Sequence, residues 1–91
     1  MNKAEKIDLI KSILDEVGTI HATSTTPEKL NSLSIAKDLI QSYTLPKNPT
    51  YDEVNINNAK VMLNVVVATY PNKIAFFVCQ SLELALSELL K

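Results

Sequence analysis

The side chains best suited to chemistry are one histidine and one cysteine, and their positions do not predict a shared site. His21 is the only histidine and follows Ile20 in a threonine-rich stretch that we expect to be a loop. An imidazole could act as a general base near neutral pH, but a solvated loop histidine is the simpler interpretation. Cys79 is the only cysteine and falls on an apolar helical face, where burial makes a thiol unreactive. A metal site needs three or four convergent ligands, so none is predicted.

Two pairs of adjacent carboxylates, Asp15/Glu16 and Asp52/Glu53, are the other candidates for catalysis. Neighbouring residues of a helix point about 100° apart, so neither pair converges on one substrate atom. Asp52 and Glu53 instead suit the first turn of a helix, where the helix dipole favours carboxylates. With Gly18 as its single glycine, the chain has no glycine-rich phosphate loop. The sequence therefore predicts a protein that is not an enzyme, without a cofactor or a metal.

Charge and cysteine content narrow the partners and the compartment. Nine lysines oppose ten carboxylates, giving a net charge of −1, and arginine is absent. Because arginine supplies the bidentate contacts to guanine and phosphate, nucleic-acid binding is disfavoured. A lone cysteine permits no intramolecular disulfide, which favours a reducing cytoplasm. The most apolar stretches, 61–70 and 74–79, are shorter than the roughly 20 residues that a transmembrane helix needs.

Apolar residues recur with helical spacing in four segments, and the prolines and the glycine lie between them. The predicted helices span about 3–17, 27–43, 51–69 and 73–90. We expect them to form one all-α domain over residues 1–91, a small antiparallel four-helix bundle.

Capping signals mark the ends of these predicted helices. Gly18 suits a helix C-terminus that requires a positive φ. Thr26, followed by a proline, is expected to cap the second helix. Thr50 and Glu53 have the spacing of a capping box at the start of the third. Asn72 is expected to cap the fourth.

The first two predicted helices should each bury one face. Their apolar faces comprise Ile7, Leu9, Ile10, Ile13, Leu14 and Val17 in the first helix, and Leu33, Ile35, Ala36, Leu39, Ile40 and Tyr43 in the second.

The third predicted helix is apolar around most of its circumference, which predicts a central, largely buried element. Its coherent polar strip consists of Asn57, Lys60 and Asn64. The β-branched run 65–67 would also suit a strand, but no other segment alternates with the period of a partner strand. The helix is therefore the better interpretation.

The predicted helix at 73–90 combines a continuous core face with apolar residues on its opposite side. The core face comprises Ile74, Ala75, Val78, Cys79, Leu82, Ala85, Leu86, Leu89 and Leu90, and a short turn at 70–72 should pair this helix with the third as an antiparallel hairpin. Phe76, Phe77 and Leu84 fall outside this face, near Gln80 and Glu88. Exposed apolar clusters commonly mark interfaces, so these five residues are the predicted protein-binding site. The alternative is that another helix or the loop at 46–49 covers them.

These features favour a non-enzymatic protein-interaction module, such as a small inhibitor, immunity or regulatory protein that binds a larger protein. Small helical proteins that protect bacteria against bacteriocins share this size and fold class, and a phage- or plasmid-encoded inhibitor of a host enzyme fits the same features. A homodimer through the helix at 73–90 and a carrier or small-molecule-binding bundle are further alternatives.

Acyl carrier proteins are also short, acidic and four-helical, and they carry phosphopantetheine on a serine in an Asp-Ser-Leu motif. The nearest match here is Asn31-Ser32-Leu33, which lacks the aspartate. The helix start predicted near Thr26 also puts Ser32 inside a helix rather than at its beginning.

Overall fold

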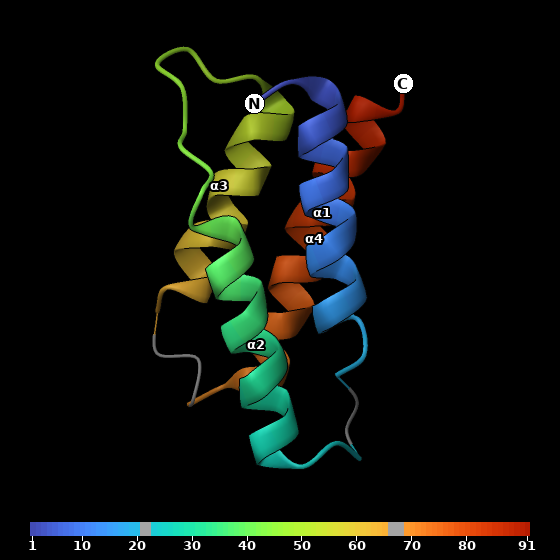
Figure 1. Cartoon of the computed structure of the whole chain (residues 1–91), viewed down its shortest axis with the longest axis vertical. Coiled ribbons are helices and arrows are strands. Elements are labelled where there is room, and N and C mark those ends of the chain that lie inside the picture. Colours follow the sequence, from blue (N-terminus) through green and yellow to red (C-terminus); the bar gives the residue numbers. More distant parts are fainter. Residues whose placement is uncertain (21–22, 66–68) are drawn as a thin grey trace.

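The computed structural model describes residues 1–20, 23–65 and 69–91, and it contains four helices. They are α1 (Lys3–Val17), α2 (Thr26–Ile40), α3 (Tyr51–Leu63) and α4 (Pro71–Leu89). Consecutive helices run in opposite directions, and both chain termini lie at the same end of the molecule (Figure 1). The described residues include no β-strand. The predicted antiparallel four-helix bundle is therefore confirmed, and it measures 38 × 22 × 17 Å.

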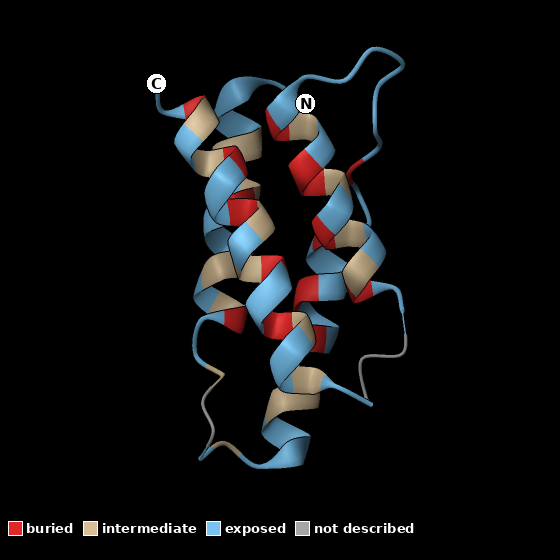
Figure 2. Cartoon of the chain, turned by 180° about the vertical axis from the view of Figure 1, so that it is seen from behind, coloured by how far each residue is buried: buried red, intermediate tan, exposed pale blue. Residues whose placement is uncertain are grey.

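One apolar core runs through the bundle, and the buried segments lie on the inner sides of the helices (Figure 2). Its buried members from the helices are Ile10, Ile13, Val17, Leu33, Ala36, Ile40, Ile56, Ala59, Leu63, Ala75, Val78, Leu82, Ala85 and Leu89. Within each helix they are spaced mostly three or four residues apart, as one buried stripe requires. The predicted apolar faces of α1 and α4 pack into the core, where Ile7, Leu9, Leu14, Ile74, Cys79 and Leu86 are partly buried. Leu90 instead follows the end of α4 and is exposed.

The buried face of α2 is narrower than its sequence predicts, and the helix is shorter. Ile35 and Leu39 are exposed, so their predicted burial is wrong. The helix ends at Ile40 rather than at Tyr43. Tyr43 is nevertheless buried, beyond the end of the helix.

The prediction that the third helix is central and buried on most sides is wrong. α3 buries one stripe, whereas Val54 and Val61 on its outer side are exposed. Every helix of a four-helix bundle keeps an outward side, and no fifth helix exists in the described chain to cover that of α3. The helix also ends at Leu63 instead of near residue 69. Residues 66–68, part of the β-branched run, lie outside the described residues.

The end of α3 has a local cause in Asn64. Its side-chain nitrogen donates a hydrogen bond to the carbonyl of Lys60 at 2.7 Å, and its backbone N–H donates to the same carbonyl at 3.1 Å. Asparagine side chains compete in this way with the regular backbone ladder. The β-branched residues that follow also lower helix propensity, so the helix stops here.

Two of the predicted helix starts are displaced. Thr25, not Thr26, caps α2, because Glu28 lies three residues beyond it and completes a reciprocal capping box. α4 begins at Pro71, which is pre-set for the first helical turn, so Asn72 lies inside the helix and does not cap it.

Gly18 follows α1 as predicted but does not have the expected positive φ, since its φ is −66°. A Cβ atom at this position would lie 2.5 Å from the carbonyl oxygen of Leu14. The glycine is therefore required by a close approach of the backbone rather than by a left-handed conformation.

Candidate functional site

The outer side of α4 is open to solvent. Phe76 is 64% exposed, Phe77 40% and Leu84 45%, while Gln80 is exposed and Glu88 is partly buried. The interpretation that a neighbouring helix or the 46–49 loop covers the apolar side chains is therefore wrong. Whether these residues bind a protein stays a prediction.

Four of the five predicted residues divide between two borders of α4. Leu84 and Glu88 line a crevice with Tyr51, the first residue of α3. Phe77 precedes Leu84 by seven residues, which is about two helical turns, so it lies on the same side of α4, toward α3. Phe76 instead borders the end of α1. The two phenylalanine rings still touch edge to face, with centroids 5.5 Å apart.

Exposed apolar residues also lie on α3, which packs beside α4. Tyr51, Val54 and Val61 are exposed on α3, and Val65 is exposed just beyond its end. The two helices are antiparallel, and Tyr51 shares a crevice with Leu84. Residues that come later in α3 therefore lie beside residues that come earlier in α4. Helix geometry then places Val54 level with Leu84, and Val61 level with Phe77.

We call this surface the α3–α4 face, and it comprises Tyr51, Val54, Val61, Val65, Phe77 and Leu84. The sequence predicted only its α4 half. The apolar outer side of α3 was visible in the sequence, but it was interpreted as burial. In the structure it extends the exposed surface of α4.

The charges near the α3–α4 face are confined to its two ends. None of its six residues is charged, whereas Lys73 lies near the beginning of α4 and Glu88 near its end. Glu88 Oε2 forms an ion pair with Lys91 Nζ at 3.0 Å. The Lys73 ammonium lies 5.9 Å from the centroid of the Tyr70 ring. Depletion of charge with enrichment of aromatic residues is typical of the centre of a protein interface.

A partly buried ionic cluster joins the beginnings of α1 and α3, and the sequence did not predict it. Lys6 Nζ lies 3.0 Å from Asp52 Oδ2 and 3.3 Å from Glu53 Oε2. The Thr50 hydroxyl lies 2.7 Å from Asp52 Oδ1 and 2.8 Å from Glu53 Oε1, so its single hydrogen can be donated to either. The Thr50 N–H donates to Glu53 Oε1, in accord with the predicted helix start. One ammonium is shared by two carboxylates, and the Thr50 hydroxyl lies within hydrogen-bond distance of both, which indicates a structural role.

The pKa values of this cluster follow from its contacts. Burial by itself would raise the pKa of Asp52, but hydrogen bonds from Thr50 and Lys6 outweigh it and lower that pKa. Burial opposes the charge of Lys6 as well, yet the two carboxylates raise its pKa overall. Hydrogen bonds from Thr50 lower the pKa of Glu53.

Tyr43 fixes the loop between α2 and α3 against α3. Its hydroxyl donates to the carbonyl of Glu53 at 3.3 Å, and its own carbonyl accepts a hydrogen bond from Lys60 Nζ at 2.6 Å. Burial, with the nearby charges of Glu53 and Asp52, raises the pKa of the Tyr43 phenol to about 12. Lys60 was predicted to belong to an exposed polar strip but is partly buried in this contact.

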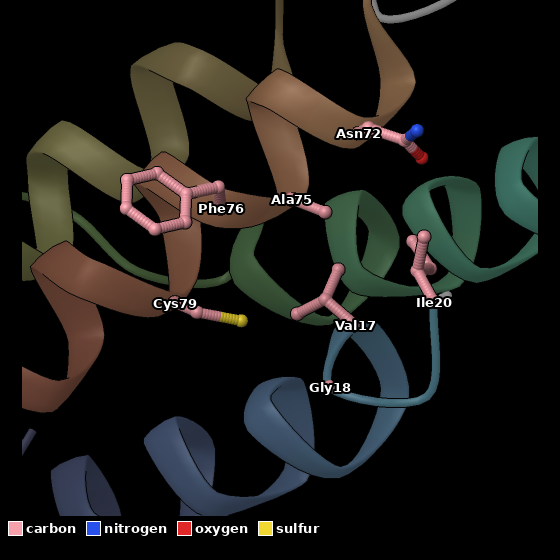
Figure 3. A pocket seen from close by; sticks show the side chains of 7 residues that line it. All are labelled: Val17, Gly18, Ile20, Asn72, Ala75, Phe76 and Cys79. Carbon is pink, nitrogen blue, oxygen red and sulfur yellow. The ribbon is translucent and has the colours of Figure 1, made fainter. Parts of the chain in front are cut away.

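A crevice of about 390 Å³ lies between the end of α1 and the beginning of α4 (Figure 3). It is lined by Val17, Gly18, Ile20, Asn72, Ala75, Phe76 and Cys79. The thiol of Cys79 and the side chain of Val17 point toward each other across it. Cys79 is only partly buried, unlike the fully packed cysteine that its helical face predicts. Burial raises the pKa of this thiol, and the charge of Glu83 raises it further, so it is a poor nucleophile at neutral pH.

The remaining sequence candidates stay separate from one another. Asp15 and Glu16 belong to the outer part of α1, Ser32 lies in the interior of α2, and His21 lies outside the described residues. Among the described residues, no three His, Cys, Asp or Glu side chains are grouped as metal ligands.

Comparisons of the chain with protein-family models, curated proteins and solved structures give no match. Within the part of the chain that the structure describes, no helix has the length and apolar character required to cross a membrane.

Proposed function

We propose that this protein is a non-enzymatic binding module that acts by docking the α3–α4 face onto another protein. The observation that carries the proposal is the exposure of apolar side chains on two neighbouring helices, Val54 and Val61 on α3 and Phe77 and Leu84 on α4, with Tyr51 and Leu84 sharing a crevice at their border. Exposed apolar residues gathered on one side of a protein commonly mark interaction sites.

The construction of this surface also suits tight binding. Its side chains stand on two packed helices, so little backbone order has to be gained on association. Tyr51 and Phe77 offer large aromatic area with few rotatable bonds, and such residues often dominate the binding energy of interfaces.

The partner that we envisage is a larger protein, bound by a small inhibitor, immunity or regulatory protein in the reducing cytoplasm. A bacteriocin-immunity-like protein and a phage-encoded inhibitor of a host enzyme are the two specific forms of this proposal. They predict different gene neighbourhoods: a bacteriocin operon for the first and phage genes for the second.

A paired-variant pull-down from a lysate of the source organism tests the proposal. Phe77→Asp places a charge on the α3–α4 face, whereas Leu39→Asp places the same charge on α2 at nearly equal exposure, 40% against 39%. We expect Phe77→Asp to lose a partner that both the unmodified protein and Leu39→Asp retain, with circular dichroism confirming that both variants fold. Equal recovery by the two variants would exclude this face as the contact surface.

A small-molecule-binding bundle is a second candidate, favoured by the crevice beside Cys79. Its volume of about 390 Å³ lies within the range of ligand pockets, and most of its lining is apolar. Native mass spectrometry of the gently purified protein should then show a retained apolar ligand. A bare chain, together with unchanged thermal stability after solvent extraction, would remove this candidate, and a mass increment on Ser32 would instead indicate a carrier.

A further inference from the structure

Two pairs of residues on α4, Phe77 with Leu84 and Lys73 with Glu88, are arranged symmetrically about one point of the helix. The midpoint between Phe77 and Leu84 falls between Gln80 and Ser81, and it is also the midpoint between Lys73 and Glu88. When two copies of a helix pack antiparallel about a two-fold axis, residues equally distant from the axis meet across the interface. An axis at this midpoint would bring Phe77 against Leu84 of the second copy.

The same axis would pair opposite charges. Lys73 of each copy would meet Glu88 of the other, so that two ion pairs would flank the Phe77–Leu84 contacts, with Gln80 and Ser81 at the axis. Both residues are accessible for this contact, because Lys73 is exposed and the Glu88 side chain is 37% exposed. Glu88 already accepts from Lys91, but a carboxylate has room for a second donor. A parallel arrangement would instead place like charges together.

We infer that a second copy of this chain occupies the α3–α4 face, packed antiparallel along α4 with Phe77 against Leu84 and Lys73 against Glu88. The apolar residues of α3 flank this axis and enlarge the contact. The bundle measures 38 × 22 Å over its largest side, so a contact of the standard 800 Å² per partner would have to extend over most of such a side. The inference rests on the proposed function in taking this face to be a protein-binding surface.

Reciprocal charge reversal tests the arrangement, with sedimentation measured across a wide concentration range at low salt. Lys73→Glu alone sets two glutamates against each other at each end of the interface, and Glu88→Lys alone sets two lysines. We expect each variant to dimerise about tenfold more weakly than the unmodified protein. An equimolar mixture of the two variants restores both ion pairs, so it should form a heterodimer of nearly unmodified affinity.

A second pair of variants tests the Phe77–Leu84 contacts. Leu84→Glu should give a folded monomer at concentrations where Leu39→Glu, its matched control on α2, remains dimeric. A chain that is monomeric at every concentration overturns the inference. A dimer whose affinity does not recover in the mixed sample overturns the antiparallel pairing.

Failure of the self-association and failure of the proposed function give different results. A strict monomer that still captures a protein through Phe77 leaves the proposed function in place and removes only the self-association. A dimer that follows the charge-reversal pattern but captures no larger protein supports the inference and contradicts a role as an inhibitor of one.

Discussion

Lys6 Nζ donates to Asp52 Oδ2 at 3.0 Å, although the two residues are 46 positions apart in the chain. The Lys6 side chain is only 13% exposed and the Asp52 side chain 8% exposed, so solvent and salt screen their attraction weakly. The contact fixes the beginning of α1 against the beginning of α3. It thereby holds α3 in place at the end where Tyr51 begins the α3–α4 face.

Replacement of Lys6 by methionine should lower the free energy of unfolding by about 2 kcal/mol, because it leaves the Asp52 carboxylate without its partner in a mostly buried position. Methionine retains the apolar stem of the lysine, so little packing is lost. Lys3→Met, at an exposed position of the same helix, should change stability by less than about 0.5 kcal/mol. Urea denaturation measures both, and equal effects would contradict the importance of the pair.

Acid should destabilise the protein by protonating the carboxylates of Asp52 and Glu53. The folded state lowers the pKa of Asp52 below its ordinary value of 3.8 and that of Glu53 below 4.5. The stability they contribute is present above those ordinary values and is lost as the pH falls through the lower, folded-state pKa values. Asp52→Asn should be less stable than the unmodified protein at neutral pH, and the difference should shrink below about pH 4. Unfolding curves across this range check the convergence, and parallel pH profiles would argue against it.

Alkali should act through Tyr43 and Lys6. Folding raises the pKa of Tyr43 from 10.0 to about 12 and raises that of Lys6 above 10.5. A raised pKa stabilises the fold fully below the ordinary value, and this contribution is lost as the pH rises toward the folded-state value. Tyr43→Phe should therefore lose less stability than the unmodified protein above pH 10. The difference between the absorbance titrations of the two proteins isolates the Tyr43 phenolate, and an ordinary pKa there would refute the prediction.

Leucines two positions apart on α4 should differ sharply in importance. Leu82 is completely buried, so Leu82→Ala should cost about 3 kcal/mol through lost burial and the cavity that remains. Leu84 is exposed, and Leu84→Ala should cost less than about 1 kcal/mol in the monomer. Denaturation at low protein concentration compares the pair, and similar losses would mean that the Leu84 side chain is packed.

Cys79 should react slowly with thiol reagents at neutral pH. Burial and Glu83 raise the pKa of its thiol, and the partly buried sulfur lies in the crevice between α1 and α4. Alkylation should be slower than that of a free cysteine and should accelerate when urea unfolds the chain. If Cys79 in the native protein were alkylated as fast as free cysteine, its thiol would be neither shielded from the reagent nor of raised pKa.

Local signals in the sequence determined most of the secondary structure. Helical spacing of apolar residues and the capping pairs specified four helices, because both depend on residues three or four positions apart. The helix ends were less accurate where local competition decided them, as at Asn64, whose side chain shares the Lys60 carbonyl with the backbone N–H.

Tertiary structure decided which apolar residues are covered. The sequence shows that α3 has apolar residues on several sides, but burial depends on how many neighbours surround a helix, and four helices leave each one an outward side. Val61 is therefore exposed, although its type and spacing also suit a core. Likewise, Lys6 and Asp52 meet only because the antiparallel chain direction places the beginnings of α1 and α3 at one end, a relationship that no local pattern encodes.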